Sequence, residues 1–456
     1  MKVCKFGGSS VADAAQITKV CDIMLADPAR RVLVVSAPGK RNAGDTKVTD
    51  MLISCAKKAL AGEDTTEERA AVVERYASIQ RDLGIDAKVI ETIDADIAAR
   101  LASDHSDEGA FMDLLKAAGE DNSAKLIAAV LQARGVDAEY VNPAKAGMLL
   151  EGGAGAATLC SASYGFLHNS LTRVLDSNPN AIVVFPGFFG VTHSGVVATF
   201  PRGGSDITGA ILAAAIEAEC YENFTDVDTV YAVDPRVVPE VKHGIDKMTY
   251  REMRELAYAG FGVFHDEAVM PAFRAGIPIN IRNTNHPDLP GSWIVPKREV
   301  HDCKVVGIAS DTDFVNIYID KYMMNREVGF GRKLLQIFEE EGVSFEHMPT
   351  GIDNITVIVR HSNFDDETEH RVMDRIRKEL KPDSVFCEHE HTIIMVVGEG
   401  MQYGIGVAAR ATQALADEGI SIEMINQGAS EISMMFGVRE RYRARAVQAL
   451  YHAFFD

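Results

Sequence analysis

The chain has 456 residues, of which 47% are hydrophobic and 25% charged, and its 66 acidic and 46 basic side chains give a formal net charge of −20. This is the composition of a globular protein with about two to four domains. So acidic a surface repels nucleic acid and anionic membranes, which excludes both as expected partners. A site for other anions therefore needs locally concentrated cations, backbone N–H groups or a metal ion.

The thiols and the first residues favour a reducing compartment. The seven cysteines, at positions 4, 21, 55, 160, 220, 303 and 387, are scattered without a CxxC pair, which is typical of buried, reduced thiols. Met1–Phe6 lacks the apolar core of a signal peptide, and no stretch reaches the roughly 18 apolar residues of a membrane span. We expect a cytoplasmic protein.

Short apolar runs alternate with helical patterns through the first region. The runs predict strands buried on both faces at Val3–Phe6, Val32–Val35, Ala181–Phe185 and Ile277–Ile281. Helical spacing predicts helices at Met51–Leu60, Ser123–Gln132 and Ile207–Ala218. This alternation predicts an α/β fold with a mainly parallel sheet and helices on both faces.

Composition also suggests where the domains end. The turn-rich segment Thr284–Gly291 predicts a boundary that ends a first domain at residues 1–295. Within this domain, residues 63–107 are charged and Ala-rich with helical spacing, which predicts a surface helical hairpin.

The last third contains an internal repeat. The sequence EGVSFE at Glu341–Glu346 returns as EGISIE at Glu418–Glu423, 77 residues later. Each unit has the pattern strand, Gly-containing turn, amphipathic helix, then Gly-Val/Ile-Ser opening another strand. This predicts two α+β domains, at residues 311–385 and 386–456, that pack side by side, sheet to sheet.

Two glycine-rich loops follow the same plan, and the first is Lys5-Phe6-Gly7-Gly8-Ser9-Ser10. A buried strand is followed by two glycines, a hydroxyl residue and then a helix. In this arrangement the backbone N–H groups and the Lys5 ammonium group are suited to bind a phosphate. The alternative, a tight strand–helix turn with a snorkelling lysine, has equal weight on these residues alone.

The second loop is Arg202-Gly203-Gly204-Ser205-Asp206, again ahead of a helix. Arg202 is suited to a bidentate grip on a carboxylate. The alternative is an ordinary helix start, with Ser205 as N-cap and Asp206 complementing the helix dipole. Because both loops open helices, they suggest a site between them for a polyphosphate and a carboxylate substrate.

Two acidic segments have simple alternatives. Thr225–Arg236 contains three aspartates suited to Mg²⁺ or a nucleotide, but an Asp-rich turn after a strand is common and is favoured in isolation. Glu120 precedes the helix expected near Ser123, where an acid usually complements the helix dipole.

Taken together, these motifs resemble the signatures of aspartate kinases, in order and at compatible spacing. The resemblance covers nearly the whole chain, and the C-terminal repeat resembles that family's pair of ACT domains. It implies an amino-acid-kinase fold and a strand within residues 296–310 that pairs into the second ACT unit. The chain departs from the family at Pro201, where Gly is usual, and at Gly262, where many members carry Lys.

The resemblance implies the following site. ATP would be bound by Lys5, Phe6, Gly7, Gly8, Ser9, Thr225, Asp226, Tyr231, Arg236, Gly262 and Val263. Aspartate would be bound by Ser36, Thr49, Glu120, Phe188, Arg202, Gly203 and Ser205, with Glu120 on the α-ammonium group. Lys5 and Asp206 would be the catalytic pair. Mg²⁺ would accompany ATP without direct side-chain ligands.

The implied reaction converts ATP and L-aspartate to ADP and 4-phospho-L-aspartate, the first step toward lysine, threonine and methionine. The β-carboxylate nucleophile is ionised at neutral pH, with a pKa of about 3.9, so no general base is required. The alternatives are another amino acid kinase of the same fold and a non-catalytic amino-acid sensor.

The ACT pair implies feedback by an amino acid, with lysine the first candidate and threonine the second. The expected effector residues are Glu327, Gly329, Phe330, Phe345, Glu346 and Asp353, whose acids suit a cation; solvated acids on a strand edge are the alternative. Free sheet edges favour a homodimer or tetramer through the ACT domains.

Overall fold

The computed structural model describes residues 1–456 except 202, 262–265, 300–303, 403 and 429. The chain divides into two compact units. The first comprises Met1–Val230, Gly244–Tyr250 and Val263–Arg298, and the second comprises Tyr231–His243, Arg251–Gly262 and Glu299–Asp456. No helix among the described residues is long and apolar enough to cross a membrane.

An eight-stranded sheet forms the centre of the first unit. Its order is β12 (Lys247–Thr249), β14 (Ser292–Val295), β13 (Ile279–Asn283), β9 (Cys220–Thr225), β1 (Lys2–Phe6), β2 (Arg30–Val35), β6 (Ile182–Pro186) and β3 (Ala138–Tyr140). All neighbours are parallel except β13 and β14. The mainly parallel sheet predicted from the apolar runs is confirmed.

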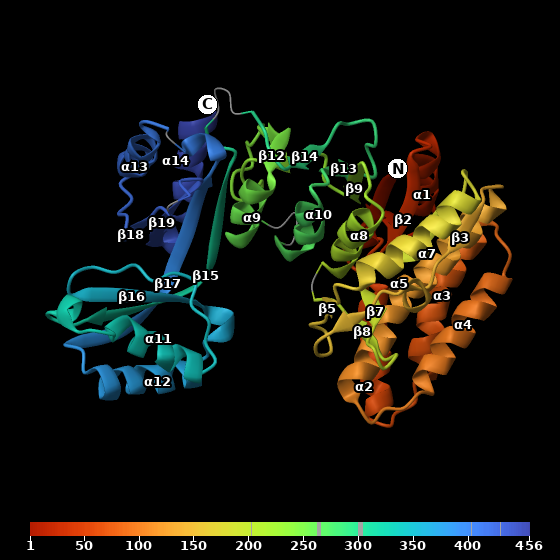
Figure 1. Ribbon diagram of the computed structural model, residues 1–456, viewed down its shortest axis with the longest axis horizontal. Coiled ribbons are helices and arrows are strands. Elements are labelled where there is room, and N and C mark those ends of the chain that lie inside the picture. Colours follow the sequence, from red (N-terminus) through yellow and green to blue (C-terminus); the bar gives the residue numbers. More distant parts are fainter. Residues whose placement is uncertain (202, 262–265, 300–303, 403, 429) are drawn as a thin grey trace. The chain divides into compact units, whose positions relative to one another are not determined.

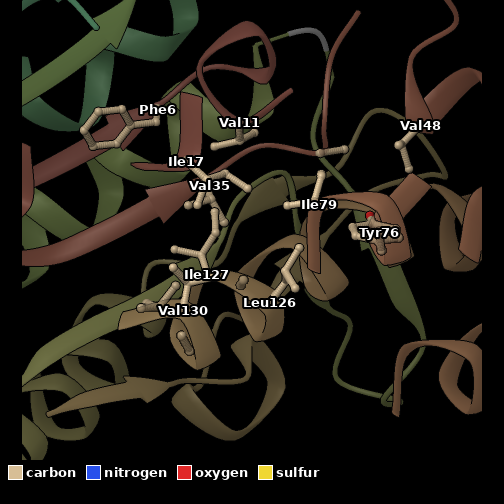
Figure 2. Packing of buried hydrophobic residues seen from close by; sticks show 14 of the residues in the cluster. Phe6, Val11, Ile17, Val35, Val48, Tyr76, Ile79, Leu126, Ile127 and Val130 are labelled. Carbon is tan, nitrogen blue, oxygen red and sulfur yellow. The ribbon is translucent and has the colours of Figure 1, made fainter. Parts of the chain in front are cut away.

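Helices cover both faces of this sheet (Figure 1). On one face α1 (Ala14–Ala26), α2 (Val48–Leu60), α3 (Thr66–Leu83), α4 (Lys88–Leu101) and α5 (Glu108–Ala133) share one hydrophobic core with β1, β2 and β6. Figure 2 shows side chains of that core from strands and helices together. On the other face α8 (Gly204–Ala215) packs on β1 and contacts α7 (Ser163–Ser177) and α10 (Met270–Ala275).

The helix expected to begin near Ser123 instead begins at Glu108, so that prediction is wrong. The turn Gly119–Ser123 is polar and suggested a loop, yet all five of its residues are buried within α5. A helix buried all round carries no amphipathic period, which explains why the spacing did not reveal it.

Short elements complete the first unit. They are α6 (Pro143–Ala146), the hairpin strands β4 (Leu150–Glu151), β5 (Thr158–Leu159), β7 (Phe189–Val191) and β8 (Val197–Thr199), and the 3-10 helices η1 (Gly8–Val11) and η2 (Asp266–Val269). Two more strands, β10 (Val230–Tyr231) and β11 (Gly244–Ile245), form a small ladder.

A single antiparallel sheet forms the centre of the second unit. Its order is β16 (Asn354–Arg360), β15 (Gly307–Asp320), β17 (Ser384–Val397), β19 (Ser433–Arg439) and β18 (Met424–Asn426). The first part of β15, Gly307–Asp311, pairs with Ile393–Val397 near β19, whereas its last part pairs with β16 and the start of β17. Because β15 and β17 run through both repeats, the predicted packing of two separate sheets is wrong.

The repeat is visible in the helices of this unit. Helix α11 (Phe330–Glu340) follows Gly329 and helix α13 (Val407–Asp417) follows Gly406, with φ angles of 82° and 89° at the two glycines. The strand predicted at Val343–His347 is wrong, because His347 makes only an isolated bridge to Ile358. The other helices are α9 (Tyr250–Tyr258), α12 (Asp366–Arg375), α14 (Arg443–Phe455), η3 (Met324–Arg326), η4 (His361–Asn363), the π-helix η5 (Ile376–Leu380), η6 (Glu399–Met401) and η7 (Glu440–Tyr442).

Candidate active site

Four predicted site residues of the first unit lie at the carboxyl ends of its strands. Lys5 is next to the last residue of β1, Ser36 follows β2, Phe188 follows β6 and Thr225 ends β9. In open parallel sheets, this edge is where ligands bind.

The described side chain of Lys5 forms a buried ion pair with Asp206 of α8. Lys5 Nζ lies 2.6 Å from Asp206 Oδ1, and the side chains are only 9% and 21% exposed. Asn223, on the neighbouring strand β9, donates its Nδ2–H to the same oxygen over 2.7 Å. The alternative of a snorkelling lysine is therefore wrong. This pairing holds a cation at the strand end, where a polyphosphate needs one.

The turn after β1 opens the 3-10 helix η1, not α1 as the pattern suggested, because Asp13 caps α1 further on. The N–H of Gly7 donates to the Phe224 carbonyl over 3.2 Å, so this amide is not free for a phosphate, which corrects the prediction. Phe6 is fully buried and stacks on Phe224, so its side chain belongs to the core. The N–H groups of Gly8 and Ser9 begin η1 and stay the phosphate donors we expect.

The second loop is held by close packing around α8. Gly203, with a φ of 77°, is the N-cap of α8 and makes no side-chain cap bond, so the alternative of Ser205 as N-cap is wrong. Phe188 has a φ of 77°, a conformation that costs a bulky residue about 1 kcal/mol. Its N–H donates to Thr208 Oγ1 over 3.0 Å and its carbonyl accepts from the Phe200 N–H over 2.9 Å. Arg202 lies outside the described residues.

Glu120 has an unusual environment. It lies in the middle of α5 and is 6% exposed, so its interpretation as a dipole complement at a helix start is wrong. Among the described residues, its Oε2 has no hydrogen-bond partner. Burial raises the pKa of this carboxyl to about 8, against smaller lowering effects of backbone N–H groups and the Lys5 charge. A buried acid of this kind is suited to receive a cationic group from a ligand.

Comparison with known proteins gives the family of the chain. Residues 1–283 match the amino acid kinase family and residues 394–454 match an ACT domain. Aspartokinase 3 of Bacillus subtilis (strain 168) is 53% identical over 455 residues, covering 100% of this chain and 99% of the relative. The chain belongs to the aspartokinases. The family resemblance read from the motifs is thereby confirmed.

Solved aspartokinases share the fold over the whole chain. The aspartate kinase of Clostridium acetobutylicum, an allosteric enzyme, is 35% identical with a TM-score of 0.86, covering 100% of both chains. E. coli aspartokinase III, solved with aspartate and ADP, is 26% identical with a TM-score of 0.79 over 100% of both chains. The same enzyme, solved with lysine and aspartate, has a TM-score of 0.75 at 25% identity.

The residues predicted to bind nucleotide occur in both units, and each unit is described by itself. Thr225 donates its hydroxyl to Asp226 over 3.2 Å in the first unit. Tyr231 and Arg236 belong to the second unit, and the guanidinium of Arg236 pairs with Asp234 at 2.8 Å while its side chain is 84% exposed. Gly262 and Val263 lie outside the described residues.

The predicted effector residues lie in the second unit, and several already have partners. Glu327 pairs with Lys321 at 2.6 Å and Lys333 at 3.0 Å. Phe330, next to the Gly329 cap, is buried in the hydrophobic core.

Glu346 is engaged as well. It pairs with Arg360 at 3.5 Å and accepts a hydrogen bond from the Tyr258 hydroxyl. Phe345 is 45% exposed, and Asp353 Oδ1 accepts the Met323 N–H over 2.8 Å. Glu327 and Glu346 already pair with cationic side chains, whereas the described partner of the Asp353 carboxylate is a backbone N–H, so Asp353 is the acid we choose for the effector test.

Sequence reasoning missed Asn223, the second partner of Asp206. Asn223 is 3% exposed within β9, where its neighbours Tyr221 and Phe224 are also buried. A polar amide in the middle of a strand buried on both faces was the available signal, because such a group needs a partner.

Proposed function

We propose that this aspartokinase transfers the γ-phosphoryl group of ATP to the β-carboxylate of L-aspartate, forming ADP and 4-phospho-L-aspartate. The observation that carries the proposal is the buried Glu120 carboxylate, whose Oε2 has no partner among the described residues. An amino-acid substrate brings an ammonium group that fits this position, whereas a nucleotide acceptor brings none. The complex of E. coli aspartokinase III with aspartate and ADP supports the same pair of ligands.

At the aspartate end, Glu120 receives the α-ammonium group and Arg202 grips the α-carboxylate. Ser36, Thr49, Phe188, Gly203 and Ser205 line the same position. The β-carboxylate is already ionised at neutral pH, so the protein supplies orientation and not a base.

At the ATP end, Lys5 is placed between two anions, the transferring phosphoryl group and the attacking carboxylate. Its ammonium group offsets their repulsion and the charge that develops in the transition state. Asp206 and Asn223 keep Lys5 aligned. In the first unit, the N–H groups of Gly8 and Ser9, with Thr225 and Asp226, bind the nucleotide phosphates. Tyr231, Arg236, Gly262 and Val263 stay expected nucleotide residues from the family resemblance.

Mg²⁺ is expected with ATP, and the residues present fit it. Lys5 and Asn223 both contact Oδ1 of Asp206, which leaves Oδ2 in the described site able to accept from water bound to Mg²⁺. When bound, Mg²⁺ neutralises phosphate charge.

Trapping of the acyl phosphate with hydroxylamine tests the reaction. With Mg-ATP and aspartate, we expect hydroxamate in proportion to the ADP formed. Equal yield from glutamate would favour another amino acid kinase activity of the fold. No hydroxamate from either substrate would favour a non-catalytic sensor, against which the intact Lys5–Asp206 pair argues.

We further propose that the ACT half containing α11 binds an amino-acid effector, lysine first and threonine second. The E. coli aspartokinase III complex with lysine supports lysine.

We also propose assembly into a homodimer or tetramer through these domains, because β16 and β18 end the sheet and exposed apolar side chains lie near β16. These side chains are Tyr322, Met323, Val328 and Ile352.

Six described cysteines are free, which favours a cytoplasmic location.

Replacing Asp353 with asparagine tests the effector contact. An asparagine Oδ1 still accepts the Met323 N–H, so the turn is kept while the charge is lost. We expect the lysine concentration for half-maximal inhibition to rise about tenfold, the loss of one charge-assisted bond. Asp366→Asn, an exposed acid in the first turn of α12, is the control. Equal sensitivity of both variants, or activity indifferent to every amino acid, would contradict the proposal.

A further inference from the structure

The helical hairpin α3–α4 was expected to lie on the surface, away from the function. However, α3 carries two neighbouring polar side chains that are buried, Arg75 at 4% exposure and Tyr76 at 0%. Figure 2 shows Tyr76 and Ile79 of α3 in the same core as Phe6 and Val35. Buried polar groups need partners, and those of α3 belong to the active-site segments.

Tyr76 reaches the helix that carries Glu120. Its hydroxyl donates to the carbonyl of Gly119 over 2.7 Å, one residue before Glu120 on α5. Because Gly119 has no side chain, α5 can also pack closely against the loop after β2. A Cβ atom at this position would lie 2.8 Å from Ala37 Cβ, which is too close, and 3.9 Å from Thr49 Oγ1. The Tyr76 hydroxyl is therefore hydrogen-bonded at the point where α5, the Ser36 loop and the start of α2 meet.

Arg75 reaches the loop on the other side. Its guanidinium donates to the Gly39 carbonyl, and its Nη1 lies 2.6 Å from Asp45 Oδ2. Gly39 in turn donates its N–H to the Gly8 carbonyl over 2.8 Å, and a Cβ on Gly39 would lie 2.6 Å from the carbonyl carbon of Gly8. Arg75 thus supports the loop that carries Ser36 and touches the expected phosphate turn.

We propose that α3 positions the reaction centre. Tyr76, through its hydrogen bond to Gly119, fixes the position of Glu120 on α5. Arg75, through its hydrogen bond to Gly39, holds the Ser36–Gly39 loop against Gly8. The proposal rests on the assignment of Glu120 to the substrate ammonium group. Displacements of about 1 Å at such groups cost large factors in rate, so residues that fix them matter without touching substrate. Both are positioning residues, not catalytic ones.

Tyr76→Phe is the test, because it removes one hydroxyl and keeps the ring in the core. We expect the KM for aspartate to rise about fivefold, the worth of one hydrogen bond, and the KM for ATP to change less than about twofold. Tyr140→Phe is the matched control. The Tyr140 hydroxyl also donates a hydrogen bond to a residue of α5, Asp121. In this variant Asp121 keeps its ion pairs with Arg100 and Lys125, so α5 should stay in place. An equal change of the aspartate KM in both variants would overturn the proposal.

The double variant Tyr76→Phe/Glu120→Gln separates this proposal from the proposed function. If Tyr76 acts through Glu120, its effect on the aspartate KM disappears in the Glu120→Gln background. An effect of Glu120→Gln with none of Tyr76→Phe would overturn the positioning role alone. No effect of Glu120→Gln would overturn the assignment of Glu120.

Arg75→Lys tests the second contact, because an ammonium group lacks the planar fork that reaches Gly39 and Asp45 together. We expect the KM values for aspartate and ATP to rise together, each about fivefold, since the Gly39 loop touches Gly8. Arg81→Lys, an exposed site on the same helix paired with Glu74, is the control. Unchanged KM values in Arg75→Lys would overturn the role of Arg75.

Discussion

Replacing Lys5 with methionine lowers kcat about a thousandfold, because removing one preorganised charge from a transition state costs about 4 kcal/mol. Methionine keeps the length and apolar stem that the buried position requires, and only the charge at 2.6 Å from Asp206 is lost. The loss also removes the Lys5 charge that lowers the pKa of Glu120, so aspartate binding weakens in parallel.

Steady-state kinetics with a coupled ADP assay measure this effect. Lys2→Met is the matched control, since Lys2 lies on the same strand but pairs with Asp27 at 2.8 Å and is partly exposed. We expect Lys2→Met to change kcat less than about twofold. A kcat of Lys5→Met within tenfold of the wild type would contradict the role assigned to Lys5.

The strands of the catalytic sheet were predictable because burial on both faces leaves a near-continuous apolar run. Val32–Val35 became β2 and Ala181–Phe185 became most of β6, each within two residues of the prediction. The centre of α5 was not predictable in this way, since its buried turn Gly119–Ser123 is polar. The single sheet of the second unit was missed because strand length, not repeat spacing, decides whether two repeats share strands.

The proposed catalytic pair could be singled out from sequence because Lys5 precedes, and Asp206 follows, a pair of glycines at a helix start, which is a local pattern. The supporting contacts of Asn223, Arg75 and Tyr76 join segments that are separated in sequence. A polar residue in a buried strand can show that Asn223 needs a partner, but no local pattern shows which segment supplies the partner. For the same reason the partners of Glu346 were invisible, and an acid on the expected strand was mistaken for a free one.

Replacing Glu120 with glutamine raises the Kd for aspartate about thirty- to hundredfold, because the ammonium group then meets a neutral amide, a loss of about 2–3 kcal/mol. The buried carboxyl has a pKa of about 8, so at pH 7 most free molecules hold a proton there. An arriving ammonium group favours the ionised carboxylate. Aspartate binding at pH 7 therefore releases protons from the wild type and none from this position in the variant.

Titration calorimetry in buffers of different ionisation enthalpy measures this release. Glu108→Gln, an exposed acid in the first turn of α5, is the control and should release protons as the wild type does. Proton release equal in wild type and Glu120→Gln would show that this carboxyl does not meet the ammonium group.

The pH dependence of the free energy of unfolding is an independent test of the environment of Glu120. The pKa of Glu120 is raised above its ordinary value of 4.5, so the folded protein holds a proton that the unfolded chain has lost between pH 4.5 and 8. The resulting contribution to stability is full below pH 4.5 and is lost as pH rises through 8. The free energy of unfolding of the wild type should fall by about 5 kcal/mol relative to Glu120→Gln across this window. If the substrate supplies the missing cation, as we propose, saturating aspartate should remove most of that fall.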